Sequence, residues 1–278
     1  MFADDTTIMV KNNNKDTFNL EINDTLNTII KWLEDNNLNI NLTKTKIMQF
    51  STYRSNTITL DINYNNNNIE VVNDIKFLGF IIDKNCNWKH HVLSVCERIN
   101  KFIFALRKLR STSSLETALA AYHGYVASVL NYGLILWGNS TDANKAFVAQ
   151  KKCIRALCKA RKRQSCKKLF KKLKILTLAG MYIKQMAIFV RENKYYFPTH
   201  GESLSRQTRH KNRLCLPHNK LKIYKNNCFC MAFSIYNKLP NDLRNDTMTD
   251  YTFKRRITKW LLEKNYYSIN EYLNERSF

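Results

Sequence analysis

From Val92 onward the apolar residues recur at helical spacing, and this feature constrains the fold most. The first such stripe consists of Val92, Val95, Cys96, Ile99, Phe102, Ile103, Leu106 and Leu109. Apolar residues three and four positions apart share one face of an α-helix. The chain has only six Gly and three Pro in 278 residues, too few for the many turns of an all-β sandwich or barrel. Most of the chain after Val92 is therefore expected to be helical.

Further helices are expected between this stripe and the C-terminus. Ser113 and Glu116 have the spacing of a capping box, which predicts a helix start there. Another helix is expected from Asp142, with a break near Gln164–Ser165. The remaining helices are expected around Leu169, Phe170 and Leu173, over Cys228–Leu239, and over Tyr251–Lys264. The polar, basic region 200–227 is expected to be loop-like.

The first ninety residues have a mixed pattern. Apolar residues at helical spacing predict a helix over Asp16–Asp35, ended by Asn36 and Asn37, because Asn tolerates the left-handed conformation of a helix cap. The run 65–68 is entirely Asn and is expected at the tip of a hairpin. Short strands are expected over Thr6–Val10, Lys46–Ser51, Thr57–Ile62, Ile69–Val72 and Ile75–Ile82. The predicted class is therefore α+β.

The charge of the chain is strongly positive. Lys and Arg number 45 against 22 Asp and Glu, a formal net charge of +23, and a surplus of this size is typical of a chain that binds nucleic acid. The segment Lys145–Arg191 contains no acidic residue, so its cations have no acid within the segment to neutralise them. A solvated surface is the alternative interpretation. The candidate nucleic-acid-binding residues are Lys151, Arg155, Lys159, Arg163, Lys167, Lys168, Lys171 and Lys172.

Membrane, secretory and zinc-binding roles are not favoured by the sequence. The longest apolar stretch, Val126–Trp137, is shorter than the ~20 residues of a spanning helix. Without a signal peptide at its start, the chain's eight Cys indicate reduced thiols and an intracellular protein, nuclear or cytoplasmic. The best zinc candidate is the trio His210, Cys215 and His218, which lacks a clear fourth ligand. No small-molecule cofactor site is evident.

Two adjacent acids near the N-terminus are the sharpest candidate for chemistry. Asp4 and Asp5 lie between short apolar runs, a pattern that favours a tight hairpin. Carboxylate oxygens at such a turn suit Mg²⁺, and nucleotidyl transfer uses two such ions. A solvated turn is the alternative for an isolated Asp-Asp pair, so the residues that follow decide between the two interpretations.

Those residues resemble a known family in their order and spacing. Phe2-Ala3-Asp4-Asp5, Lys44-Thr45 and Phe77-Leu78-Gly79, followed by Trp88 and His91, are similar to the second half of the palm in reverse transcriptases of non-LTR, jockey-like retrotransposons. Asn131-Tyr132-Gly133 with Trp137-Gly138 resembles the thumb signature of that family. Later stretches are similar to its C-terminal region. Ala179 departs from the family, which often has Pro there.

The resemblance implies roles for several residues. Asp4 and Asp5 would be catalytic and hold magnesium, and Lys44 would assist the departing pyrophosphate as a general acid. Phe77, Leu78 and Gly79 would form the primer grip. The partners would be an RNA template and a DNA primer. An exposed lysine before a strand is the alternative for Lys44, and a β-bulge the alternative for Gly79.

The resemblance also implies an arrangement of regions. Residues 1–90 would be the C-terminal part of a polymerase palm, with short antiparallel strands and a helix. Residues 91–164 would be a helical thumb, and residues 165–278 a basic, helical C-terminal region.

The expected function is RNA-directed DNA polymerisation as a segment of a retrotransposon protein. Family members take a further metal-binding carboxylate and the nucleotide-binding fingers from upstream of Phe2, so this chain is expected to be inactive alone. A non-catalytic nucleic-acid-binding remnant and a purely structural helical protein are the alternatives.

Overall fold

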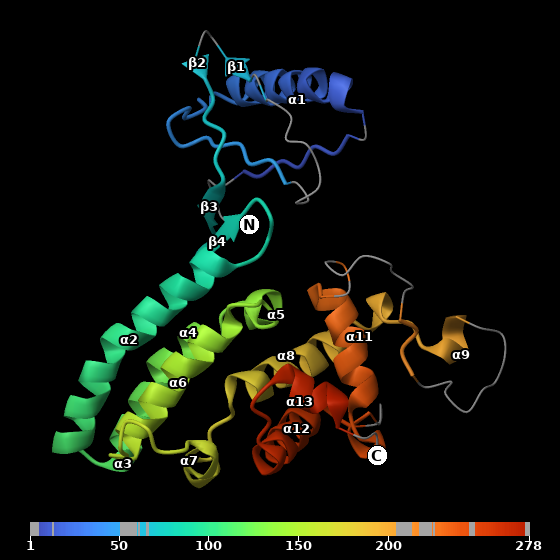
Figure 1. Cartoon of the computed structure of the whole chain (residues 1–278). Coiled ribbons are helices and arrows are strands. Elements are labelled where there is room, and N and C mark those ends of the chain that lie inside the picture. Colours follow the sequence, from blue (N-terminus) through green and yellow to red (C-terminus); the bar gives the residue numbers. More distant parts are fainter. Residues whose placement is uncertain are drawn as a thin grey trace. The chain divides into compact units, whose positions relative to one another are not determined.

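The computed structural model describes residues 6–12, 14–50, 60, 62–64, 67–203, 213–216, 224, 226–244 and 248–275. The chain forms two compact units, an N-terminal unit (Met1–Asn87) and a helical unit (Trp88–Phe278), whose elements are labelled in Figure 1. The predicted α+β class with a mostly helical remainder is confirmed. The assignment of residues 1–90, 91–164 and 165–278 to palm, thumb and C-terminal regions stays a prediction.

The described part of the N-terminal unit consists of one helix and two antiparallel hairpins. Its elements are α1 (Lys15–Asp35), β1 (Asn63–Tyr64), β2 (Asn67–Asn68), β3 (Asp74–Phe77) and β4 (Phe80–Asp83). α1 is followed by Asn37 at φ 56°, a conformation that Asn adopts at low cost. The predicted helix and its Asn end are therefore confirmed. A parallel bridge between Ile47 and Val71 adds the only other pairing in the described part of this unit.

Several strand predictions in this unit are wrong in detail. Residues 6–10 form no strand. The predicted strand Ile75–Ile82 is two strands, because Leu78 and Gly79 both have positive φ and reverse the chain. The strand predicted from Lys46 is reduced to the bridge at Ile47. Residues 51–59, 61 and 65–66 lie outside the described residues, and the flanking pair Asn63 and Asn68 confirms a hairpin around 65–66.

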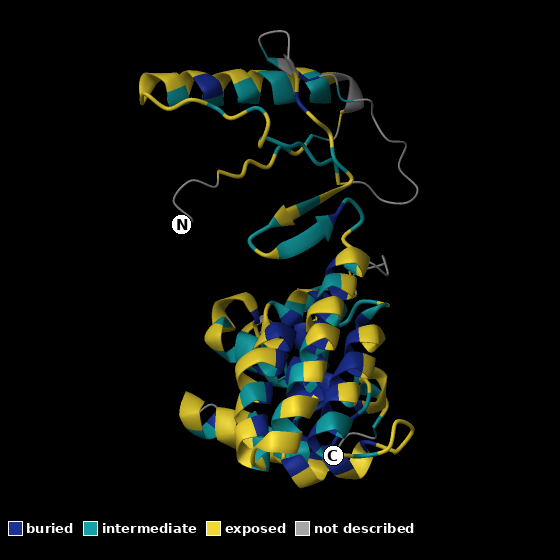
Figure 2. Cartoon of the chain, turned by 90° about the vertical axis from the view of Figure 1, so that its left-hand side faces the viewer, coloured by how far each residue is buried: buried dark blue, intermediate teal, exposed yellow. Residues whose placement is uncertain are grey.

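The described part of the N-terminal unit has a small apolar core. Its buried apolar residues are Ile30, Ile62 and Ile69. Leu20 and Trp32 of α1 are 66% and 59% exposed, and Figure 2 shows α1 largely in the colours of exposed and intermediate residues. Hydrophobic burial, the main source of stability, is therefore modest in this unit.

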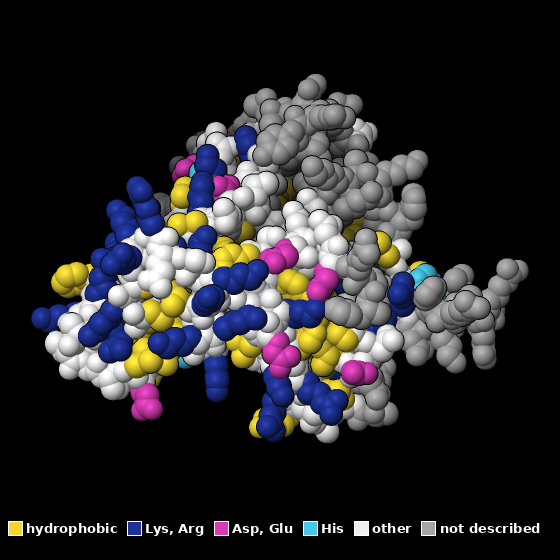
Figure 3. Space-filling model, turned by 60° about the horizontal axis from the view of Figure 1, so that its bottom comes forward, with side chains coloured by type: hydrophobic (Ala, Val, Ile, Leu, Met, Phe, Trp, Pro, Cys, Tyr) yellow, Lys and Arg dark blue, Asp and Glu magenta, His cyan; other side chains and the backbone are white. Residues whose placement is uncertain are grey.

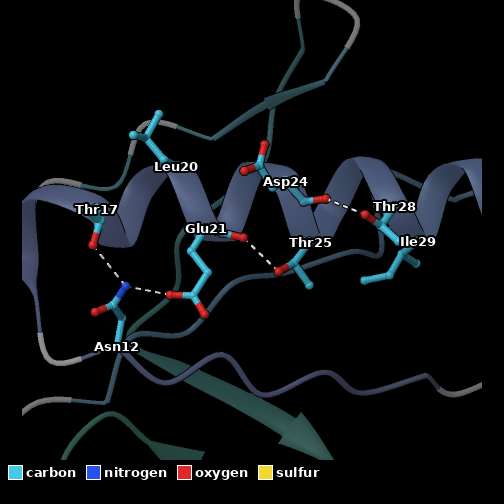
Figure 4. Close-up of a pocket in the computed structure, with 8 residues that line it drawn as sticks. All are labelled: Asn12, Thr17, Leu20, Glu21, Asp24, Thr25, Thr28 and Ile29. Carbon is cyan, nitrogen blue, oxygen red and sulfur yellow. Dashed lines mark hydrogen bonds between the residues drawn. The ribbon is translucent and has the colours of Figure 1, made fainter.

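A hollow of about 530 Å³ lies along α1 (Figure 4). Its polar side chains bond within the hollow. Asn12 Nδ2 donates to Thr17 Oγ1 at 3.1 Å and to Glu21 Oε2 at 2.5 Å. Thr25 Oγ1 donates to the Glu21 backbone oxygen and Thr28 Oγ1 to that of Asp24. These contacts stabilise the helix, and they bring no set of groups together for chemistry.

The helical unit contains the remaining elements. They are α2 (Lys89–Thr112), α3 (Leu115–Ala121), the π-helix η1 (Tyr122–Ala127), α4 (Ser128–Asn131), α5 (Leu134–Trp137), α6 (Ala143–Leu157), α7 (Lys167–Leu173), α8 (Leu178–Glu192), the 3₁₀ turn η2 (Lys194–Tyr196), α9 (His200–Ser203), α11 (Cys228–Lys238), the 3₁₀ turn η3 (Asn241–Leu243), α12 (Asp250–Lys264) and α13 (Ile269–Asn274).

The core of the helical unit lies around two helix pairs. α2 packs along α6, and α8 packs against α11, α12 and α5. The largest side chains with almost no exposure include Trp137, Tyr122, Tyr182 and Phe170. Figure 2 shows the buried residues gathered inside this unit. The predicted helices over the stripe from Val92, from Asp142, over 228–239 and over 251–264 are confirmed within a few residues.

Three details of the helical prediction are corrected. The second helix is capped by Ser114, whose side chain accepts from the Thr117 N–H at 3.1 Å, and not by Ser113. The break predicted near Gln164–Ser165 begins earlier, because α6 ends at Leu157. α8 was not predicted.

No single helix in the described part of the chain is long and apolar enough to cross a membrane. α7 and α8 are long and apolar enough only when they are taken together, and the two helices are bent by 55° relative to each other.

Candidate nucleic-acid interface

The turn that presents Lys44 is organised by Asn41. The Asn41 side-chain oxygen accepts from the Lys44 N–H at 3.2 Å and from Thr43 Oγ1 at 2.7 Å. The Asn41 backbone oxygen accepts from the Thr45 N–H at 2.9 Å. An Asn side chain that bonds the following backbone fixes a turn without neighbouring secondary structure. The Lys44 side chain is exposed, as a group that meets a ligand must be.

The residues after Lys44 attach this turn to the rest of the N-terminal unit. Lys46 forms an ion pair with Glu70. Ile47 N–H donates to the Glu70 oxygen at 3.0 Å, and the Val72 N–H donates to the Ile47 oxygen at 2.8 Å. This bridge connects the Lys44 turn to the segment that leads into β3.

The predicted primer grip is the turn of the β3–β4 hairpin. Phe77 pairs with Phe80, and the two residues between them, Leu78 and Gly79, have φ values of 47° and 80°. Positive φ at both central residues is the type I′ geometry that suits a two-residue hairpin. Gly adopts it freely, whereas a Leu with positive φ is uncommon and strained. The hairpin thus presents Gly79 as an exposed stretch of backbone at its tip.

Asp83, which no prediction singled out, fixes the chain after β4. It is 9% exposed. Its carboxylate accepts from the backbone N–H groups of Asn85 at 3.1 Å and Asn87 at 3.2 Å. The sequence signal for this turn was an Asp with an Asn two and four residues after it.

A metal centre is not formed by the residues that the structure describes, because no group of three or more His, Cys, Asp or Glu lies together among them. Asp4 and Asp5 lie outside the described residues. They are hard oxygen donors, the chemistry that Mg²⁺ prefers, so their assignment stays a proposal from the sequence. His210 and His218 of the zinc candidate also lie outside the described residues.

The eight predicted phosphate-binding residues fall on three structural pieces. Lys151 and Arg155 belong to α6, Lys159 and Arg163 to the loop after it, and the others to α7. Lys151 Nζ lies 4.6 Å from the Phe147 ring centroid, and Arg155 Nε donates to the Gln164 oxygen at 2.9 Å. These two are engaged within the unit, and the row of cations at every fourth residue is not one helical face.

α7 presents the clearest cationic face. Leu169, Phe170 and Leu173 are buried, whereas Lys167, Lys168, Lys171 and Lys172 are exposed. Lys167 lies 3.8 Å from Glu271, a weak surface pair. The other three lysines have no ion pair with a described acid.

Neighbouring helices extend the positive charge. The end of α2 contributes Arg110, whose Nε donates to the Leu157 oxygen at the end of α6 at 2.9 Å. Figure 3 shows Lys and Arg side chains spread over one face, with few Asp and Glu among them. Such a surface lowers the repulsion between its cations by binding phosphates.

The residues that resemble a thumb signature form a turn between α4 and α5. Gly133 has φ 55° between α4 and α5, and Trp137 Nε1 donates to the Tyr132 oxygen at 3.0 Å. Gln185 of α8 donates to the Asn131 backbone oxygen at 3.0 Å. These residues therefore fix a tight turn against α8.

Comparison with known families identifies the N-terminal part. The family model for reverse transcriptase (RNA-dependent DNA polymerase) matches residues 1–82. Residues 1–82 are therefore similar to reverse transcriptases. The matched range contains Lys44 and the turn at Leu78–Gly79.

A curated relative extends the similarity beyond residue 82. The chain is 25% identical, over 161 residues, to a probable RNA-directed DNA polymerase from transposon BS of Drosophila melanogaster. The match covers 56% of this chain and 18% of the relative. No solved structure matches the chain. The resemblance to a non-LTR retrotransposon reverse transcriptase is confirmed, and placement in the C-terminal part of that enzyme stays a prediction.

Proposed function

We propose that this chain is part of an RNA-directed DNA polymerase and holds a duplex of RNA template and DNA primer. The match of residues 1–82 to the reverse transcriptase family carries the proposal. The exposed lysines of α7 support it, because a chain that holds a duplex needs cations that face solvent, and three of these four have no ion pair with a described acid.

The roles proposed for the N-terminal unit follow the reverse transcriptase motifs. Asp4 and Asp5 hold magnesium, which when bound stabilises charge on the transferred phosphoryl group. Lys44 donates a proton to, or neutralises, the departing pyrophosphate, and its exposed position at the end of the Asn41 turn leaves its ammonium group free to reach a ligand. The Leu78–Gly79 turn lets a primer backbone approach closely, because Gly79 has no side chain to obstruct it.

We expect no template-dependent primer extension by this chain alone. A metal-dependent polymerase needs a complete set of ligands. No group of three or more His, Cys, Asp or Glu lies together among the described residues, and the match covers only 18% of the curated relative. The measurement is extension of oligo(dT) on poly(rA) with Mg²⁺ or Mn²⁺, with an Asp4→Asn variant as the control. Extension that disappears in Asp4→Asn would contradict the expected inactivity and support the metal assignment.

We expect the α7 lysines to account for much of the salt dependence of duplex binding. Replacing Lys167, Lys168, Lys171 and Lys172 by Gln lowers the slope of log K against log salt by about 0.9 for each phosphate that the variant no longer neutralises. The measurement is fluorescence anisotropy with an RNA–DNA hybrid over a range of salt concentrations.

The matched control removes four cations from α12, by changing Lys254, Arg255, Arg256 and Lys259 to Gln. All four are exposed, but α12 also carries Asp250 and Glu263, which offset its charge. If both variants bind with the same slope, the duplex is held by general charge and not by the α7 face.

A further inference from the structure

α2 exposes an aromatic side chain within a basic surface. Phe104 is 77% exposed, although α2 buries Ile99, Ile103 and Leu106 on its opposite side. A single exposed apolar residue is ordinary on a protein surface. Whether Phe104 forms part of a binding site therefore depends on the side chains around it.

The charges within one helical turn of Phe104 on its side of α2 are all positive. Lys101 precedes it by one helical turn, and Arg107 and Lys108 follow it by one turn, so all three lie on the same side of α2. All three are exposed, and the sequence from Arg98 to Leu115 contains no acidic residue. Cationic side chains therefore lie one helical turn before and one helical turn after Phe104.

α6 adds a further cation to this surface. Lys152 Nζ lies 3.3 Å from Asn100 Oδ1, one turn before Phe104. α6 packs along α2 over much of its length. Two packed helices thus contribute to one surface.

We propose that Phe104 and its flanking cations bind a single strand of nucleic acid, with an unpaired base stacked on the Phe104 ring and phosphates on Lys101, Arg107, Lys108 and Lys152. A base–aromatic stack combined with a basic groove is the general means of holding a single strand without sequence preference. Within a duplex each base face is covered by its neighbours and is not free to stack on such a ring. This site deepens the proposed polymerase function by adding a place for unpaired template on α2.

The test compares a single strand with a duplex. Anisotropy measures binding of labelled oligo(dT), oligo(U) and a blunt RNA–DNA hybrid to the wild type, Phe104→Leu and Phe104→Tyr. Leu keeps an apolar side chain and lacks a ring, whereas Tyr keeps the ring. We expect Phe104→Leu to bind both single strands about tenfold more weakly, with the same salt slope and unchanged hybrid binding. Phe104→Tyr should resemble the wild type.

Several results would overturn the proposal. They are unchanged single-strand binding by Phe104→Leu, an equal loss for strand and hybrid, and association between copies of the protein that Phe104→Leu abolishes. The last would show a protein partner at this surface. The outcome for the proposed polymerase function is separate. A wild type that fails to bind the hybrid, yet binds single strands through Phe104, would refute duplex holding and leave this site standing.

Discussion

Gly138→Ala is expected to destabilise the helical unit by about 3 kcal/mol or more. A Cβ atom at this position would lie 2.5 Å from Tyr182 Cδ2 and 2.7 Å from the Leu134 backbone oxygen. Tyr182 is 1% exposed, so its ring has no open space to move into. The Leu134 oxygen is fixed because it accepts the Gly138 N–H at 2.7 Å. Overpacking of a rigid site costs typically ~1–3 kcal/mol and sometimes more.

The measurement is urea unfolding followed by far-UV circular dichroism, with Gly124→Ala as the matched control. Gly124 lies in η1, and a Cβ there would meet nothing within 4 Å. A Gly-to-Ala change at a helical position with room stabilises by roughly 0.4–1 kcal/mol, because it restricts the unfolded chain. The two substitutions should therefore have opposite signs. Similar unfolding midpoints for both variants would show that the helical unit accommodates a methyl group at position 138 without losing stability.

The helices with one apolar face were predictable, and the most central one was not. The stripe from Val92 to Leu109 predicted α2 because its apolar residues alternate with Arg and Lys at a period of 3.6. α8 has buried residues at every position from Leu178 to Ile183. These six positions are buried on every face of the helix and leave no stripe, so the only periodic signal for α8 is the helical spacing of Ile183, Met186, Ala187 and Val190.

Helix ends were predictable only where a single residue near the end favoured a cap or a turn. Ser113 and Ser114 are adjacent and both residues suit an N-cap, but only Ser113 has a Glu three residues later, so the capping-box pattern favoured the wrong serine. The structure uses Ser114 as the cap of α3, while the Ser113 N–H closes α2 by donating to the Leu109 oxygen at 2.7 Å. After α6 and α7, the chain turns at Lys159 and Lys174, each with φ 52°. Lysine gives no sequence signal for such a turn.

The candidate site was predictable where it depends on local sequence. The four exposed lysines of α7 follow from the alternation of Lys with Leu and Phe, and Lys44 follows from its motif. The roles of Gly138 and Asn131 depend on contacts with Tyr182 and Gln185 of α8, far away in the sequence. The resemblance identified these positions without giving their physical reason, and the structure supplies it.

The buried side chain of Gln150 joins three segments that are far apart in the sequence. Gln150 is fully buried. Its Nε2 donates to the Leu176 oxygen at 2.9 Å and to the Tyr122 hydroxyl at 3.0 Å. Its Oε1 accepts from the Leu178 N–H at 2.9 Å. One amide group therefore provides hydrogen-bond partners for a carbonyl oxygen in the loop between α7 and α8, an N–H group in the first turn of α8 and a hydroxyl group at the start of η1.

Gln150→Leu is expected to destabilise the helical unit by about 3 kcal/mol or more. Leucine has a similar size but leaves a backbone N–H, a carbonyl oxygen and a hydroxyl group buried without partners, and each such group costs roughly 1–3 kcal/mol. Gln185→Leu is the matched control. Gln185 also makes two hydrogen bonds, both with Asn131, but these are exposed, so water replaces them and the loss should stay below about 1 kcal/mol.

The same urea unfolding experiment separates these outcomes, and Tyr122→Phe refines the test. Removing the Tyr122 hydroxyl leaves Gln150 bonded to Leu176 and Leu178, so this variant should lose only about 1 kcal/mol. In the double variant the hydroxyl that Gln150→Leu would have left buried and unpaired is absent, and the combined loss should be smaller than the sum of the two single losses. If the losses simply add, the Tyr122–Gln150 hydrogen bond does not couple η1 to α6. If Gln150→Leu unfolds at the wild-type midpoint, the amide is not what holds the α7–α8 loop in place.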